Sequence, residues 1–145
     1  MIENYRKFRV RTPVRTFRDL EVYQESTKLA AAVFNLKLPT KYREETAEEI
    51  QNLKQMAKVV PKLIVESYND KFNDFKVADK KLEIACQTIN LIIAKLDFLN
   101  AFVEDSEFRN LLFEILKRYQ RVKSRIVNLK RAWGRVFRPS TEKIR

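Results

Sequence analysis

The chain has 145 residues, of which 30 are Lys or Arg and 19 are Asp or Glu, giving a formal net charge of +11. It contains a single Gly, a single Cys and no His. One glycine argues against phosphate-cradling loops, tight hairpins and most sheet proteins, which need positive φ at many corners. Without His and with one Cys, the usual zinc sites and the Ser–His and Cys–His nucleophile systems lack their ligands and bases. We therefore expect an all-α protein that is not an enzyme, with no catalytic residues, no metal site and no cofactor.

The first half of the chain predicts two helices whose apolar residues are spaced alternately three and four apart, which turns one stripe toward a partner. The first helix should start near Thr16 and end before Pro39, since proline cannot continue it. The second should run from about Thr46 to Asn69 as one kinked helix, because the spacing passes through Pro61 without a phase jump. The stripes are Leu20, Tyr23, Thr27, Ala30 and Phe34 in the first helix, and Ile50, Leu53, Ala57, Val60, Ile64 and Ser67 in the second.

The second half predicts two longer helices, the last of them begun by Asp105 or Ser106 as N-cap. Connections of roughly four to eight residues suit antiparallel neighbours. The expected architecture is an antiparallel up-down-up-down four-helix bundle. The stripes are Phe75, Ala78, Leu82, Ala85, Ile89, Ile92, Leu96, Leu99 and Val103 in the third helix, and Leu112, Ile115, Tyr119, Val122, Ile126, Leu129, Trp133 and Val136 in the fourth.

Charge is distributed unevenly along the chain. Residues 1–18 carry a net +5, residues 19–116 a net −4 and residues 117–145 a net +10. We expect a basic flexible arm over residues 1–13, the bundle over 14–137 and a basic C-terminal tail over 138–145. No stretch reaches the ~18 apolar residues of a membrane-spanning helix. The first residues do not resemble a signal peptide. We therefore expect a cytoplasmic protein with no membrane partner.

Two columns of apolar residues lie well away from the predicted bundle stripes, about 130° from the stripe centre at ~100° per residue. Such a patch is too large to leave in water, and a four-helix bundle has no fifth element to cover it. We predict that the columns form a homo-oligomer interface. In the alternative, these helices have broad apolar faces and lie deeper in the bundle. The columns are Val22, Leu29 and Leu36 in the first helix, and Val77, Ile84, Leu91 and Phe98 in the third.

The fourth helix carries cations opposite its apolar stripe, with no acid among them. Arginine predominates, which favours bidentate phosphate contact. A polyanion such as RNA or RNA–DNA is the expected partner. No Asn or Gln is arranged for base edges, so affinity should come from phosphate neutralisation. The alternatives are a merely solvated face and a scaffold that meets an acidic protein. The candidate residues are Lys117, Arg121, Arg125, Arg131 and Arg135 on the face, Arg118 and Arg138 beside and beyond it, and Arg6, Lys7, Arg9 and Arg11 in the arm.

Three sequence motifs resemble a known family. The run Phe17-Arg18-Asp19-Leu20-Glu21-Val22-Tyr23-Gln24 resembles an "F-x-D-L-x-V-[WY]-Q" helix opening. The segment Leu36-Lys37-Leu38-Pro39 with Tyr42-Arg43 resembles the link "F-P-x-x-[EQ]-[RK]", and Val60-Pro61 through Ile64-Val65-Glu66 resembles "S-I-P-x-N-I-x-E-G", with Leu63 and Ser67 in place of its Asn and Gly. These motifs are typical of four-helix-bundle proteins that include the 23S ribosomal RNA intervening-sequence proteins and the accessory variability determinants of diversity-generating retroelements.

The resemblance covers roughly residues 14–137. The pair Trp133-Gly134 near the end of the fourth helix is similar to the Gly-Trp pair of the retroelement branch, in reversed order. This resemblance implies a homo-oligomeric barrel, typically a pentamer, whose basic surface holds RNA or RNA–DNA and docks a reverse transcriptase. The number of subunits and the polymerase partner are implied by the family alone.

Overall fold

Five α-helices and one 3-10 turn make up the computed structural model, which describes residues 13–139. No strand occurs in this range, so the prediction of an all-helical chain is confirmed. The predicted basic arm up to residue 12 and the tail from residue 140 lie outside the described residues. The elements are η1 (Phe17–Asp19), α2 (Glu21–Phe34), α3 (Thr40–Arg43), α4 (Ala47–Asp70), α5 (Phe75–Phe102) and α6 (Ser106–Phe137).

The two longest helices, α5 and α6, begin at side-chain caps. The carboxylate of Asp105 accepts a hydrogen bond from the Phe108 N–H at 2.9 Å, as expected for the N-cap of α6. Asp74 caps α5 in the same way through the Val77 N–H at 3.2 Å. α4 passes through Pro61 as a single helix, as the uninterrupted spacing predicted.

The start of the first helix differs from the prediction. Thr16 does form a capping box with Asp19, but it caps only the turn η1. Leu20 is extended, with φ −73° and ψ 125°, and so separates η1 from α2. α2 therefore begins at Glu21 and has only 14 residues.

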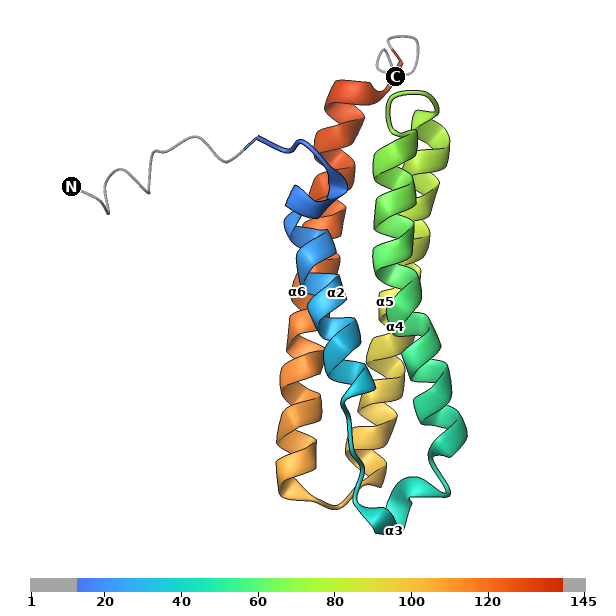
Figure 1. Cartoon of the computed structure of the whole chain (residues 1–145), viewed down its shortest axis with the longest axis vertical. Coiled ribbons are helices and arrows are strands. Elements are labelled where there is room, and N and C mark those ends of the chain that lie inside the picture. Colours follow the sequence, from blue (N-terminus) through green and yellow to red (C-terminus); the bar gives the residue numbers. More distant parts are fainter. Residues whose placement is uncertain (1–12, 140–145) are drawn as a thin grey trace, which may run out of the picture.

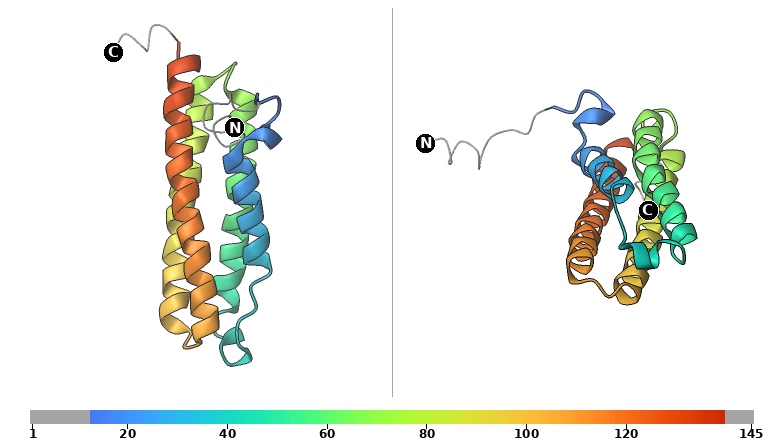
Figure 2. Two further views of the ribbon diagram at one scale, coloured as in Figure 1. Left: turned by 90° about the vertical axis from the view of Figure 1, so that its left-hand side faces the viewer. Right: turned by 60° about the horizontal axis from the view of Figure 1, so that its bottom comes forward.

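The four longest helices lie side by side in a bundle-like fold, and successive ones run in opposite directions (Figure 1). α4 packs against α2 and α5, while α6 packs against α5 and α2. The short helix α3 lies in the connection from α2 to α4, at one end of the long helices (Figures 1 and 2). Two contacts of this arrangement matter below: the edge where α2 meets α6, and the groove between α5 and α6.

The apolar stripes of the last three long helices form the core almost as predicted. Every predicted stripe residue of α5 is buried, as are those of α4 except Ile50, which is half-buried. In α6 the prediction fails at Val136, which is 66% exposed. The reason is that α2 starts at Glu21, which pairs with Arg125, so nothing of α2 reaches the end of α6.

The prediction that an apolar column of the first helix is exposed was wrong. Val22, Leu29 and Leu36 are buried in the core, whereas Thr27 and Phe34 of the predicted stripe are exposed. The true stripe of α2 includes Ser26, whose hydroxyl donates to the Tyr23 carbonyl at 3.1 Å and is thereby satisfied inside the core. A polar residue at a core position shifted the apparent phase of the pattern. Val22, Leu29 and Leu36 therefore belong to the monomer core and not to an oligomer interface. For α2, the alternative expectation of a broad apolar face buried in the bundle is the correct one.

Lys71 is an unusual buried cation near the α4–α5 turn, with only 5% of its surface exposed. Its ammonium lies 3.3 Å from the ring centroid of Tyr68 and 4.2 Å from that of Phe72, and it donates to the Tyr68 carbonyl at 3.0 Å. The rings of Trp133 and Phe137 stand 5.7 and 5.8 Å away, so α4 and α6 meet around one charge. Burial lowers the pKa of Lys71.

This lowered pKa predicts a pH dependence of stability. Between the folded-state pKa of Lys71 and its ordinary value of about 10.5, the unfolded chain binds more protons than the folded one. The free energy of unfolding of the native protein, measured relative to Lys71→Met, should therefore rise with pH in that interval. Urea unfolding of both proteins at several alkaline pH values measures this difference. A difference that stays constant or falls with pH would contradict the assignment.

A second prediction concerns Tyr119, which is fully buried. Its hydroxyl has no hydrogen-bond partner among residues 13–139, and burial raises its pKa. Tyr119→Phe should raise the free energy of unfolding by about 1 kcal/mol, because it removes a desolvated, unsatisfied group. Tyr42→Phe is the matched control and should lower stability, because the Tyr42 hydroxyl accepts the Glu104 N–H at 3.0 Å. Denaturant unfolding that shows equal losses for both variants would contradict this account.

Candidate nucleic-acid interface

From Ile115 onward, the charged residues of α6 are all cations. Residues 115–138 contain nine Lys or Arg and no Asp or Glu. Because the apolar stripe of this helix is buried, the charged side chains are distributed over its remaining surface, toward α2, toward solvent and toward α5. The nine are Lys117, Arg118, Arg121, Lys123, Arg125, Lys130, Arg131, Arg135 and Arg138.

On the side of α2, two of these arginines are paired with glutamates. Arg118 lies 3.2 Å from the carboxylate of Glu25, and Arg125 pairs with Glu21. The expectation of a face free of acids is therefore corrected, because the helix wheel of α6 alone does not show what α2 brings beside it. Exposed pairs of this kind are worth under about 1 kcal/mol each, so a polyanion can compete for them.

Three predicted arginines remain unpaired on the outer surface. Arg121, Arg131 and Arg135 are exposed, and none makes a hydrogen bond or ion pair within residues 13–139. Lys117 pairs with Glu114 of its own helix at 3.3 Å, and Arg138 stands over the ring of Phe75 at 5.5 Å. Within the described range, the predicted cations of the fourth helix therefore divide into those paired with α2 or with Glu114, those unpaired and exposed, and Arg138 beside α5.

Sequence reasoning missed two cations of this surface. Lys123 and Lys130 lie close to the apolar stripe on the helix wheel, which hid them. In the structure both face α5: Lys130 approaches Asp79 at 3.8 Å, and Lys123 has no ion pair among the residues described. The absence of any acid over residues 115–138 is the signal that would have found them.

A groove of about 610 Å³ runs between α5 and α6 on this side. Its lining sets amide side chains beside cations, an arrangement that was not predicted from the sequence. Asn90 comes from α5, so a pattern read along α6 alone could not place it. The groove is lined by Asn90 and Ile93 of α5 and by Gln120, Lys123, Ser124, Val127, Asn128 and Arg131 of α6.

The predicted apolar column of α5 does reach the surface. Leu91 is 59% exposed, Phe98 is 49% exposed and Val77 is 40% exposed, while Ile84 is half-buried. These four are spaced seven apart, so they form one stripe along the helix. The α5 apolar stripe denotes Val77, Ile84, Leu91 and Phe98 from here on.

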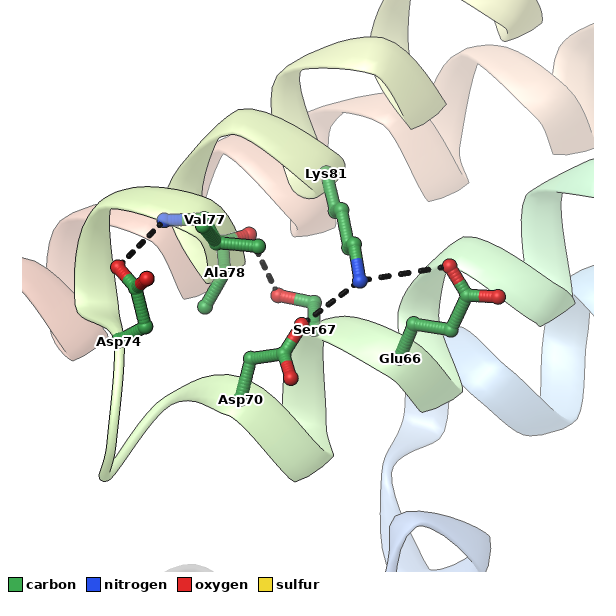
Figure 3. Close-up of polar contacts among 7 residues, drawn as sticks. All are labelled: Glu66, Ser67, Asp70, Asp74, Val77, Ala78 and Lys81. Carbon is green, nitrogen blue, oxygen red and sulfur yellow. Dashed lines mark hydrogen bonds and ion pairs between the residues drawn. The ribbon is translucent and has the colours of Figure 1, made fainter.

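Two of the lysines beside the α5 apolar stripe are paired with carboxylates of α4. The ammonium of Lys81 lies 2.7 Å from Asp70 and 3.5 Å from Glu66 (Figure 3), and that of Lys95 lies 2.7 Å from Glu49. The hydrogen bond to Asp70 raises the pKa of Lys81. The stripe is therefore flanked by closed ion pairs, in contrast to the cations of α6.

The α4–α5 contact that supports these pairs is tight at Ser67. Its hydroxyl donates to the Ala78 carbonyl at 2.7 Å, and both residues are fully buried (Figure 3). This hydrogen bond satisfies the buried hydroxyl where the two helices approach each other.

Comparisons with protein-family models, with curated proteins and with solved structures find no match for this chain. Within residues 13–139, no helix has the length and apolar character needed to cross a membrane. No group of three or more Cys, Asp or Glu in the same range is placed to hold a metal ion.

Proposed function

We propose that this chain is a non-catalytic, oligomeric nucleic-acid-binding protein whose α6 cations hold RNA or an RNA–DNA hybrid. The observation that carries the proposal is the acid-free run of nine cations over residues 115–138, several of them without ion pairs in the part of the chain that the structure describes. A solvated face ordinarily mixes both signs. A one-sign surface built mostly of arginine instead suits a phosphate backbone.

The α5 apolar stripe supports the oligomer. A chain of net charge +11 repels its own copies, so self-association needs a surface where charge is neutralised. The stripe is such a surface, because Lys81 and Lys95 beside it form ion pairs with Asp70, Glu66 and Glu49. In the proposed assembly, antiparallel four-helix bundles meet through Val77, Ile84, Leu91 and Phe98 and leave α6 facing outward.

The family resemblance of residues 14–137 extends the proposal. It supports a pentameric barrel in the cytoplasm and a role as an accessory subunit that presents template RNA to a reverse transcriptase of a diversity-generating retroelement. The arm cations Arg6, Lys7, Arg9 and Arg11, which lie outside the described residues, would add to the same phosphate contacts.

The test is the salt dependence of RNA binding. Replacing Arg121, Arg131 and Arg135 with Gln should lower the slope of log affinity against log salt by about two units, because each lost phosphate contact removes roughly 0.7–0.9. The control replaces Lys37, Lys58 and Lys62 with Gln. These three are exposed, lie outside α6 and leave the same net charge. Filter binding or fluorescence anisotropy over a salt series gives both slopes.

The control should keep the native slope if the α6 face holds the backbone. Equal slopes for the two triple variants would overturn the proposal, and a scaffold that meets an acidic protein would take its place.

The oligomer has its own prediction. Replacing Leu91 and Phe98 with Glu would bury charges in a dry contact, at several kcal/mol per site, so light scattering should show monomers. The control replaces Leu111 and Phe113 with Glu, which are 48% and 53% exposed on α6 and stand outside the stripe. It should keep the native mass. A native protein that is monomeric at micromolar concentration, or equal dissociation of both variants, would contradict the interface.

A further inference from the structure

The groove between α5 and α6 gathers uncharged hydrogen-bonding groups as well as cations. Along α6, residues 120, 123, 124, 127, 128 and 131 follow the three-and-four spacing, so they form one wall about three turns long. The half-buried side chains of Ile93 and Val127 supply the apolar part of its lining. Lys123 and Arg131 are its two charges, and no carboxylate lines it.

The amides of this groove are not used by the protein itself. Within residues 13–139, the side chains of Asn90, Gln120 and Asn128 make no hydrogen bond. Amides elsewhere are engaged: Asn100 donates to the Arg109 carbonyl at 2.9 Å, and Gln24 donates to the Arg18 carbonyl at 2.8 Å. Three open amides therefore converge on one recess beside two open cations.

A carboxamide presents a donor and an acceptor side by side, which is the pattern that base edges offer. In a duplex, the Watson–Crick edges are occupied, and the deep major groove of paired RNA is closed to side chains. Only an unpaired base can enter a recess between two helices and rest its face on Ile93 and Val127. Lys123 and Arg131 are placed to meet the phosphates on either side of such a base.

We infer that the α5–α6 groove binds an unpaired stretch of nucleic acid and contacts its bases through Asn90, Gln120 and Asn128. This inference rests on the proposed function and adds to it a preference among sequences, which the cations alone do not supply. The groove holds no aromatic ring, so discrimination comes from hydrogen bonds and not from stacking.

The experiment compares two triple variants that keep every charge. The groove variant carries Asn90→Ala, Gln120→Ala and Asn128→Ala. The control carries Asn52→Ala, Gln55→Ala and Asn69→Ala, which removes the same three amides from exposed positions of α4. Alanine favours helix at all six positions, so both variants should fold. Circular dichroism and light scattering check that they do.

Affinities are measured for adenine, cytosine and uracil oligoribonucleotides of equal length, for adenine and cytosine oligodeoxynucleotides, and for an RNA duplex. Native protein and control should discriminate among the RNA homopolymers. The groove variant should lose about tenfold or more on the preferred sequence, in RNA and DNA alike, because base edges are common to both. Its affinity for the duplex and its salt slope should stay native.

Several outcomes would overturn the inference. One is that the native protein binds all unpaired sequences with equal affinity, and another is that the groove variant binds with native affinity. Either result would contradict the inferred base contact and would leave the proposed salt-dependent binding by the α6 face standing. A loss confined to RNA would assign the amides to the ribose hydroxyl and overturn base contact. Absence of any nucleic-acid binding by the native protein would remove both this inference and the proposed function.

Discussion

The mutual repulsion of the α6 cations is the constraint on which the rest of the structure depends. Lys117, Arg121 and Arg125 are spaced four apart, as are Arg131 and Arg135, and each such pair disfavours an isolated helix by a few tenths of a kcal/mol. The helix holds because its opposite stripe is buried against α5 and α2, with Tyr119 and Ile126 fully enclosed. On the side of α6 that faces α2, glutamates reduce this repulsion by pairing with Arg118 and Arg125. What remains is a helix whose inner stripe stabilises the bundle-like fold while its outer surface keeps open cations.

From this constraint the surface divides into regions with different chemistry. The α2–α6 edge is partly neutralised by Glu21 and Glu25, whereas the α5–α6 edge keeps Lys123 and Arg131 open beside amides. The α5 apolar stripe lies next to the ion pairs that join α5 to α4, so it combines exposed apolar area with local neutrality. The proposed polyanion binding and the proposed self-association would therefore use different faces of the chain.

The sequence predicted the long helices well and the short one poorly. In α4, α5 and α6, many turns of regular spacing average out single exceptions, so cores such as Leu82 to Leu99 were placed correctly. α2 has 14 residues, and Ser26 at a core position was enough to shift its phase. Contacts between helices could not be predicted from the pattern of one helix alone. The pairing of Arg118 with Glu25, and the position of Asn90 beside the α6 amides, depend on how two helices pack together.

The central claim, that the cations of α6 contact a nucleic-acid backbone, is tested most directly by lysine footprinting. Acetylation of the native protein with and without structured RNA, followed by mass spectrometry, reports the accessibility of each lysine. The account predicts that RNA protects Lys117 and Lys123 on α6, while Lys58 and Lys62 on α4 react as in the free protein. Protection spread evenly over all four lysines, or confined to Lys58 and Lys62, would contradict it.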